Sequence, residues 1–126
     1  MMSLRPHYAE TLRLCGVRPS ALPPDLIDRS VALVERQSDV GGMDRAFLSA
    51  SRSLAWTLAR ARAYRTAMAA VRVPVLLIQG DQDRLVPVDA ARAAARRFPA
   101  WRYVELAGAG HVPQLQMPEA VAGQIV

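Results

Sequence analysis

The fold of this chain is decided by the stretch Val73–Pro87, which reads VPVLLIQGDQDRLVP. Its apolar run from Val75 to Ile78 lies between a proline and a glycine. That pattern is typical of a short strand buried on both faces of a parallel sheet. Asp81 and Asp83 follow the run directly. We expect a functional site here, because in open α/β sheets the chemistry sits in the loops after the carboxyl ends of the strands.

A second motif follows the next predicted strand, which we place at Trp101–Leu106. Residues 108–113 read GAGHVP and put His111 in a glycine-rich loop. The segment Asp89–Arg97 predicts a helix between the two strands, with its acid at the N-terminus and its arginines at the C-terminus, as the helix dipole favours. A strand–helix–strand order of this length predicts two parallel strands. Their carboxyl ends then lie side by side, so the acidic loop and the loop of His111 should meet.

These residues resemble the C-terminal half of the α/β-hydrolase family. Its members commonly carry Gly-Asp-x-Asp-x-x-Val-Pro after an apolar strand, then Gly-x-Gly-His, and a Pro-Glu that opens the last helix. Here these are Gly80–Pro87, Gly108–His111 and Pro118-Glu119. The resemblance is tight from about Val73 to Val121. One departure is Gln116-Met117, where many members have a Glu and a variable residue before the proline.

The resemblance implies that Asp83 and His111 are the acid and the base of a Ser-His-Asp triad. In such a triad the carboxylate orients the imidazole, which takes a proton from the nucleophile. Asp81 is the alternative acid; at this spacing we expect one aspartate in the site and the other bound to loop amides. Taken alone, His111 would read as a turn histidine bonded to backbone. The family implies hydrolysis of small ester-type or amide-type substrates, with no metal and no organic cofactor.

The nucleophile of such a triad is not found in the sequence. The Gly-x-Ser-x-Gly elbow is absent, and Ser51, with serines two residues away on either side, lies inside a helical pattern. Cys15 lacks small flanking residues, since Arg13 and Val17 stand there. We expect the nucleophile and the oxyanion hole to precede residue 1 in a longer protein, and the end at Val126 also looks cut short. This chain alone should therefore have no meaningful esterase activity.

The predicted fold class is α/β, with a helical cap or lid over residues 1–72 and the C-terminal part of a hydrolase core over residues 73–126. We expect residues 1–24 to be irregular, with at most a short helix at Ala9–Leu14. A helix should run from Pro24 to about Gln37. The apolar periodicity from Phe47 to Val71 predicts one long helix or two joined by a bend. A final helix should begin at Pro118.

Composition limits the other function classes. The chain has 126 residues, is 52% hydrophobic, and has no apolar run near the roughly 20 residues of a membrane span. The N-terminus lacks the apolar core of a signal peptide, so we expect a cytoplasmic protein with no membrane partner. A single cysteine excludes an internal disulfide and a cysteine-based zinc site.

The net charge of +5 comes from 16 basic residues, all of them arginine. Arg60, Arg62 and Arg65 cluster near two aromatic residues, which raises a basic helical nucleic-acid-binding module as a third hypothesis. A solvated helix face explains the cluster better, so we expect no nucleic-acid partner.

The second hypothesis is a non-catalytic remnant or interaction module. Two parallel strands leave sheet edges unpaired, which predicts self-association or a partner chain carrying the other strands. A small-molecule substrate is expected if the N-terminal half completes the site.

Overall fold

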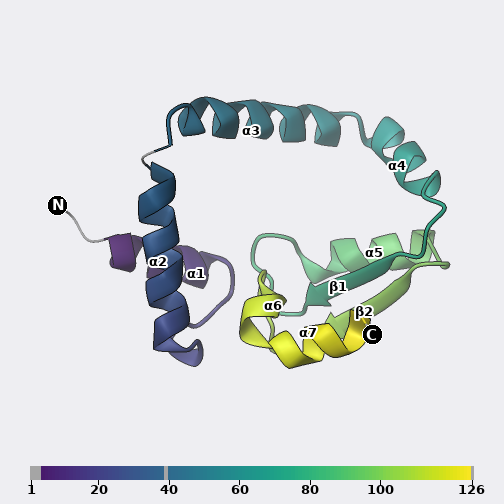
Figure 1. The fold of residues 1–126 in the computed structure, drawn as a ribbon. Coiled ribbons are helices and arrows are strands. Elements are labelled where there is room, and N and C mark those ends of the chain that lie inside the picture. The colour runs from purple at the N-terminus through teal and green to yellow at the C-terminus, as the bar shows by residue number, and fades with distance from the viewer. Residues whose placement is uncertain (1–3, 39, 126) are drawn as a thin grey trace. The chain divides into compact units, whose positions relative to one another are not determined.

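The computed structural model of the chain describes residues 4–38 and 40–125. Helices dominate and one short sheet lies near the C-terminal end (Figure 1). The elements in chain order are α1 (Leu4–Leu14), the 3-10 turn η1 (Pro19–Ala21), α2 (Pro24–Ser38), α3 (Met43–Ala59), α4 (Ala61–Ala69), β1 (Leu76–Gly80), α5 (Val88–Arg97), β2 (Arg102–Leu106), α6 (Pro113–Gln116) and α7 (Pro118–Ile125).

The chain divides into two compact units. One unit combines the chain up to Val31 with the chain from Pro74 onward, and the other spans Ala32–Val73. The expected boundary between residues 72 and 73 lies beside one junction of these units. The segment up to Val31, which includes α1, belongs to the same unit as both strands. This segment therefore helps to form the site described below.

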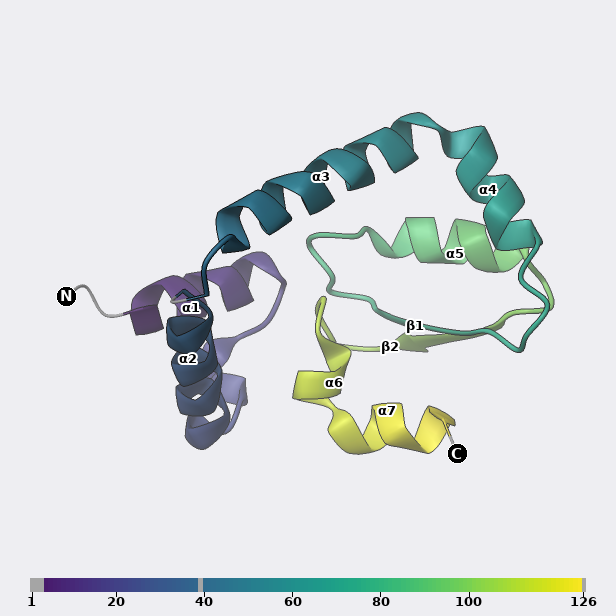
Figure 2. The ribbon, with the colours of Figure 1, turned by 45° about the horizontal axis from the view of Figure 1, so that its top comes forward.

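Strands β1 and β2 pair in parallel, in a register from Leu76 opposite Arg102 to Gly80 opposite Leu106. The prediction of two parallel strands joined by a helix is confirmed, and the fold class is α/β. Figure 2 shows α5 on one side of the strand pair and α7 on the other. The parallel register places the end of β1 beside the end of β2, so the loops that follow them leave the sheet together.

An ion-pair network ties α5 to β2. The guanidinium of Arg92 donates from Nε and Nη2 to the two carboxylate oxygens of Glu105, at 2.9 and 2.7 Å. Nη1 of Arg92 also donates to Asp89 at 3.1 Å, and the hydroxyl of Tyr103 donates to Glu105 at 2.8 Å. The hydrogen bonds from Arg92 and Tyr103 hold the pKa of Glu105 below its ordinary value. The two-point contact fixes the orientation of the helix on the strand.

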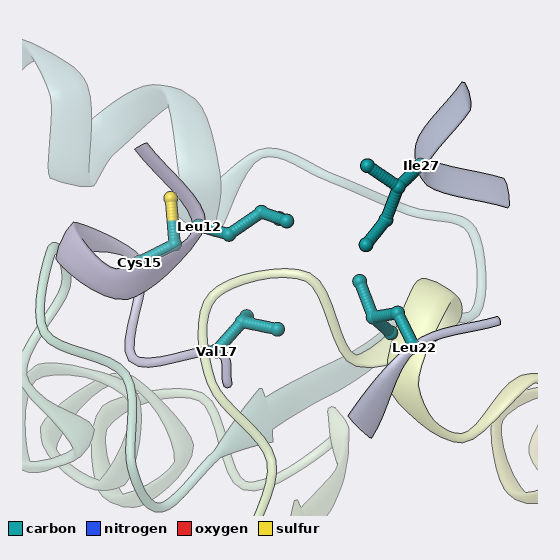
Figure 3. Packing of buried hydrophobic residues seen from close by; sticks show 5 residues of the cluster. All are labelled: Leu12, Cys15, Val17, Leu22 and Ile27. Carbon is teal, nitrogen blue, oxygen red and sulfur yellow. The ribbon is translucent and has the colours of Figure 1, made fainter. Parts of the chain in front are cut away.

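The N-terminal part of the first unit has a small apolar core. Its buried members are Leu12, Cys15, Val17, Leu22 and Ile27, from α1, the following turn and the start of α2 (Figure 3). Val17 is the most deeply buried of them, with 1% of its surface exposed. Val112 and Leu115, which follow β2, pack against this cluster. The core therefore joins the N-terminal helices to the loop that carries His111.

The first 24 residues are more helical than expected in the part that the structure describes: the helix allowed at Ala9–Leu14 is present but extends toward the N-terminus, while the segment between α1 and α2 holds only the short η1. Helix α1 begins at Leu4 and includes Pro6. A proline in the first turn is tolerated because the backbone N–H groups of that turn have no partner within the helix. The apolar face of α1 is stabilised by burial of Leu12 in the core. Tertiary packing thus supports a helix longer than the one expected from the sequence.

The long helical pattern forms two helices, one of the two outcomes that the periodicity allowed. Helix α3 ends at Ala59 and α4 begins at Ala61. Arg60 between them has φ −99° and ψ 47°, which is not helical. The short helix α6 was not predicted.

No helix within 4–38 and 40–125 combines the length and apolarity that a membrane crossing requires.

Candidate active site

The carboxylate of Asp83 is held at the end of β1 by its own loop. Its Oδ1 accepts hydrogen bonds from the backbone N–H groups of Leu85 and Val86, at 2.8 and 2.9 Å. An aspartate forms such contacts readily, because its short side chain reaches the amides two and three residues ahead. Its Oδ2 accepts a hydrogen bond from the side-chain amide of Gln79 at 2.7 Å. The carboxylate is therefore fixed from two sides.

His111 meets this carboxylate from the loop after β2. Its Nδ1 lies 2.9 Å from Oδ2 of Asp83, and the two side chains are 38% and 4% exposed. An ionised carboxylate only accepts, so Nδ1 carries the proton and Nε2 is left as an acceptor in the neutral ring. Within 4–38 and 40–125 no group hydrogen-bonds to Nε2. The imidazole can therefore take a proton at Nε2 while Asp83 holds its orientation.

The surroundings of Asp83 keep it ionised. Burial on its own raises the pKa of this carboxyl. Hydrogen bonds from Val86, His111, Leu85 and Gln79 lower it further than burial raises it, so the pKa lies below its ordinary value. Hydrogen bonds to the charged form of a group favour that form. Asp83 is consequently an anion at neutral pH, the state that stabilises a protonated imidazole.

The position of His111 depends on the turn after α1. The backbone N–H of His111 donates to the carbonyl of Cys15 at 2.8 Å. The preceding Gly110 donates its N–H to the side-chain oxygen of Gln116 at 2.7 Å. A Cβ atom at Gly110 would lie 2.5 Å from the Cys15 carbonyl oxygen, so only glycine permits this approach. Gly110 is therefore needed because two backbones meet at the base of the site.

The two loops are also joined directly. Asp81 Oδ1 accepts a hydrogen bond from the N–H of Gly108 at 2.7 Å, and the N–H of Gln82 donates to the carbonyl of Ala109 at 2.8 Å. Asp81 thus binds a loop amide and Asp83 faces His111. Asp83 binds loop amides as well, so the two tasks are not divided cleanly between the two acids.

Two elements of this site were not predicted from the sequence. Gln79 is a buried polar residue in an otherwise apolar strand, one position before the glycine that ends β1. A polar side chain in a buried strand was the signal that could have identified Gln79, because a buried amide needs hydrogen-bond partners. The carbonyl of Cys15 had no sequence signal beyond the neighbouring Gly16, because any residue type supplies a backbone carbonyl.

Neither Cys15 nor Ser51, the two side chains considered as nucleophiles, lies in surroundings that would activate it. The thiol of Cys15 is buried, and this burial, together with the nearby charge of Asp83, raises its pKa. A raised pKa keeps the sulfur protonated, and the thiolate is the reactive form. Ser51 lies within α3 and is exposed. In the described part of the chain, no three or more His, Cys, Asp or Glu side chains form a group that could hold a metal ion.

Comparison with known proteins gives one family and a few relatives. Residues 3–124 match the family model described as alpha/beta hydrolase family. A pimeloyl-[acyl-carrier protein] methyl ester esterase of Aromatoleum aromaticum is 42% identical over 59 residues, which are 47% of this chain and 24% of that protein. The esterase of the same name from Xanthomonas campestris pv. campestris is 41% identical over 58 residues, 46% of this chain and 23% of its own length. The matched segment thus spans about a quarter of these relatives. No solved structure matches the chain.

Proposed function

Because the chain belongs to the alpha/beta hydrolase family, we propose that it supplies the acid and the base for hydrolysis of a small carboxylic ester, with Asp83 as the acid and His111 as the base. The observation that carries the proposal is the 2.9 Å contact between Nδ1 of His111 and Oδ2 of Asp83. The names of the relatives in Aromatoleum and Xanthomonas, both methyl ester esterases, favour an ester over an amide.

In the proposed reaction a hydroxyl oxygen attacks the ester carbonyl carbon and its proton passes to Nε2 of His111. The imidazolium formed is stabilised by the carboxylate of Asp83. The tetrahedral intermediate then expels the alcohol, which takes the proton from Nε2, and an acyl-enzyme is left. Water, deprotonated by the same nitrogen, releases the acid and restores the hydroxyl. Asp83 remains ionised throughout, as the lowered pKa of its carboxyl favours.

The attacking hydroxyl comes, in this proposal, from a polypeptide segment other than the residues described here. Such a segment would carry a serine on a sharp strand-to-helix turn, the usual source of this nucleophile in the fold. It would also pair with the outer edges of β1 and β2, whose backbone groups invite another strand. The chain would then be one part of the working enzyme, and the isolated chain should not turn over esters.

The test uses the chain mixed with a polypeptide that carries the Gly-x-Ser-x-Gly turn, taken from the sequence upstream of Met1 or from an adjacent gene. A fluorophosphonate probe should label that serine in the mixture, and p-nitrophenyl acetate should be hydrolysed. Both signals should be lost with His111→Ala. Asp83→Asn should lower the rate by roughly 10⁴-fold, as for an acid that fixes the tautomer of a triad histidine.

Asp81→Asn is the matched control, because it makes the same change two residues away in an acid that binds the Gly108 amide. It should retain most of the activity. Three results contradict the proposal: equal losses in Asp81→Asn and Asp83→Asn, ester turnover by the isolated chain that depends on His111, and stable assembly with the second polypeptide without labelling. The last result would favour the interaction-module hypothesis.

A further inference from the structure

A hollow lies in the same compact unit as the Asp83–His111 pair. Its volume is about 420 Å³, and it is lined by residues from three segments: Arg13, Gly16, Val17 and Arg18 from the end of α1 and its turn, Gln82 and Arg84 from the acidic loop, and Gly108. Neither Asp83 nor His111 lines it. We call it the arginine pocket. Its volume falls in the range of small-molecule sites, roughly 300–1,000 Å³.

The charge of the arginine pocket is strongly positive. Its lining residues include three arginines and no acidic residue. Arg13 forms an ion pair with Glu10 at 2.9 Å, but both side chains are exposed, so the pair is weak and exchangeable. Arg18 and Arg84 form no ion pair with any residue in 4–38 or 40–125. Asp83 is the nearest acid along the chain, next to Arg84, but its side chain is 4% exposed and its oxygens are held by His111, Gln79 and two loop amides. Oδ1 of Asp81 is occupied by the N–H of Gly108.

The backbone of the pocket is fixed. Gly16 has φ +78°, and a Cβ there would lie 2.1 Å from the carbonyl oxygen of Gln82, so the two segments touch through backbone. The same position would be 3.5 Å from Cγ of Arg84, which places the stem of Arg84 over Gly16. Val17 is anchored in the apolar core. The arginines are therefore carried by two segments whose separation cannot change freely.

We propose that the arginine pocket binds a phosphate group. Guanidinium groups recognise oxyanions through paired N–H donors. One guanidinium can satisfy a carboxylate, whereas a phosphate offers more charge and more acceptor oxygens. Three arginines around one hollow therefore match a phosphate dianion better than a carboxylate. The phosphate is either free inorganic phosphate or the terminal group of a phosphomonoester. This site is separate from the ester site and does not depend on the proposed hydrolase function.

The test is calorimetric titration of the full chain with sodium phosphate, at constant ionic strength maintained with sodium chloride. A parallel titration uses phenyl phosphate as a simple monoester. Saturable binding with one site per chain is expected. Replacing Arg18 and Arg84 together by Gln should weaken it at least tenfold. Arg96→Gln, which removes one charge at an exposed position of α5 and so matches the single variant Arg84→Gln, should change it less than twofold.

Arg18→Lys is the conservative variant, because it keeps the charge and removes the planar fork; it should weaken binding by less than the double variant. If the double variant fails to fold, as judged by circular dichroism, the single variants Arg84→Gln and Arg18→Lys decide. The proposal is overturned by an absence of saturable binding, or by equal losses in Arg96→Gln and the pocket variants. Tighter binding of phenyl phosphate than of inorganic phosphate would identify a phosphomonoester as the ligand. Binding of inorganic phosphate without binding of phenyl phosphate would identify free phosphate. Neither titration contains an ester or the second polypeptide, so its result is separate from the ester chemistry.

Discussion

The side-chain amide of Gln79 donates to the same Oδ2 atom of Asp83 that faces Nδ1 of His111. The amide nitrogen also lies 3.2 Å from the carbonyl oxygen of Val86 and 3.4 Å from that of Gly80. Gln79 is buried, so its amide bridges the strand and the far side of the acidic loop without competition from water. We assign it a positioning role: it holds the carboxylate that in turn holds His111.

Gln79→Leu should loosen that carboxylate. The variant removes one hydrogen bond to a charged oxygen, which contributes about 1.5–3 kcal/mol. The free energy of unfolding at pH 7 should fall by that order, and the pKa of Asp83 should rise because one of the groups that lower it is gone. Carbon-13 NMR titration of the aspartate carboxyl measures the pKa directly.

Gln114→Leu is the control for that change, because Gln114 is exposed in α6. It should leave both the stability and the carboxyl titration close to those of the wild type. An unchanged Asp83 titration in Gln79→Leu would show that the amide does not hold the carboxylate. A drop in stability with no movement of that titration would indicate a packing role alone.

Acid should destabilise the fold partly through Asp83. Its pKa is lower in the folded chain than its ordinary value, so its contribution is fully present above the unfolded value, near 3.9, and is lost as the pH falls through the folded value. Urea unfolding between pH 7 and pH 2 should show this loss below about pH 4. Glu105, whose pKa is also lowered, contributes in the same direction.

Asp83→Asn separates the two acids, because the amide cannot titrate. The variant should be less stable than the wild type at pH 7 and should lose less stability on acidification. If the free energy of unfolding falls with the same slope below pH 4 in both proteins, the acid sensitivity belongs to Glu105 and other groups.

Gly110→Ala should disturb the base of the site. The added Cβ would lie 2.5 Å from the Cys15 carbonyl oxygen and 2.9 Å from Gly16, so one backbone must move. Overpacking of this kind costs about 1–3 kcal/mol. The hydrogen bond from His111 N–H to Cys15 should weaken, which faster amide hydrogen exchange at His111 would report.

Gly123→Ala provides the comparison, since nothing lies within 4 Å of a Cβ at that position in α7. An alanine in a helix is favoured over glycine by about 0.5–1 kcal/mol, so this variant should be as stable as the wild type or slightly more. Equal behaviour of the two glycine variants would contradict the close approach at Gly110.

Leu12→Ala should strongly destabilise the first unit, because Leu12 is 4% exposed in its apolar core. Truncation of a buried leucine costs about 2–5 kcal/mol. Leu14→Ala, two residues along the same helix, removes a side chain that is 59% exposed and should cost less than about 0.5 kcal/mol. Denaturant unfolding of both variants measures the difference, and similar losses would place the core elsewhere.

The sequence by itself determined the two strands, their parallel order, and the loops that carry Asp83 and His111. These features are local: an apolar run ended by glycine, a helix with acid and arginines at its ends, and a glycine-rich turn each follow from a few neighbouring residues. The adjacency of the two loops then follows from the geometry of parallel strands.

Only the tertiary structure decided which partners complete the site. The carbonyl of Cys15 under His111, the amide of Gln79 on Asp83 and the close backbone contact at Gly110 depend on how separate segments pack. Helix α1 shows the same dependence, since it forms across Pro6 and buries Leu12 against the turn and α2. Hydrogen bonds and burial between distant segments are set by the packed fold, and local periodicity carries no record of them.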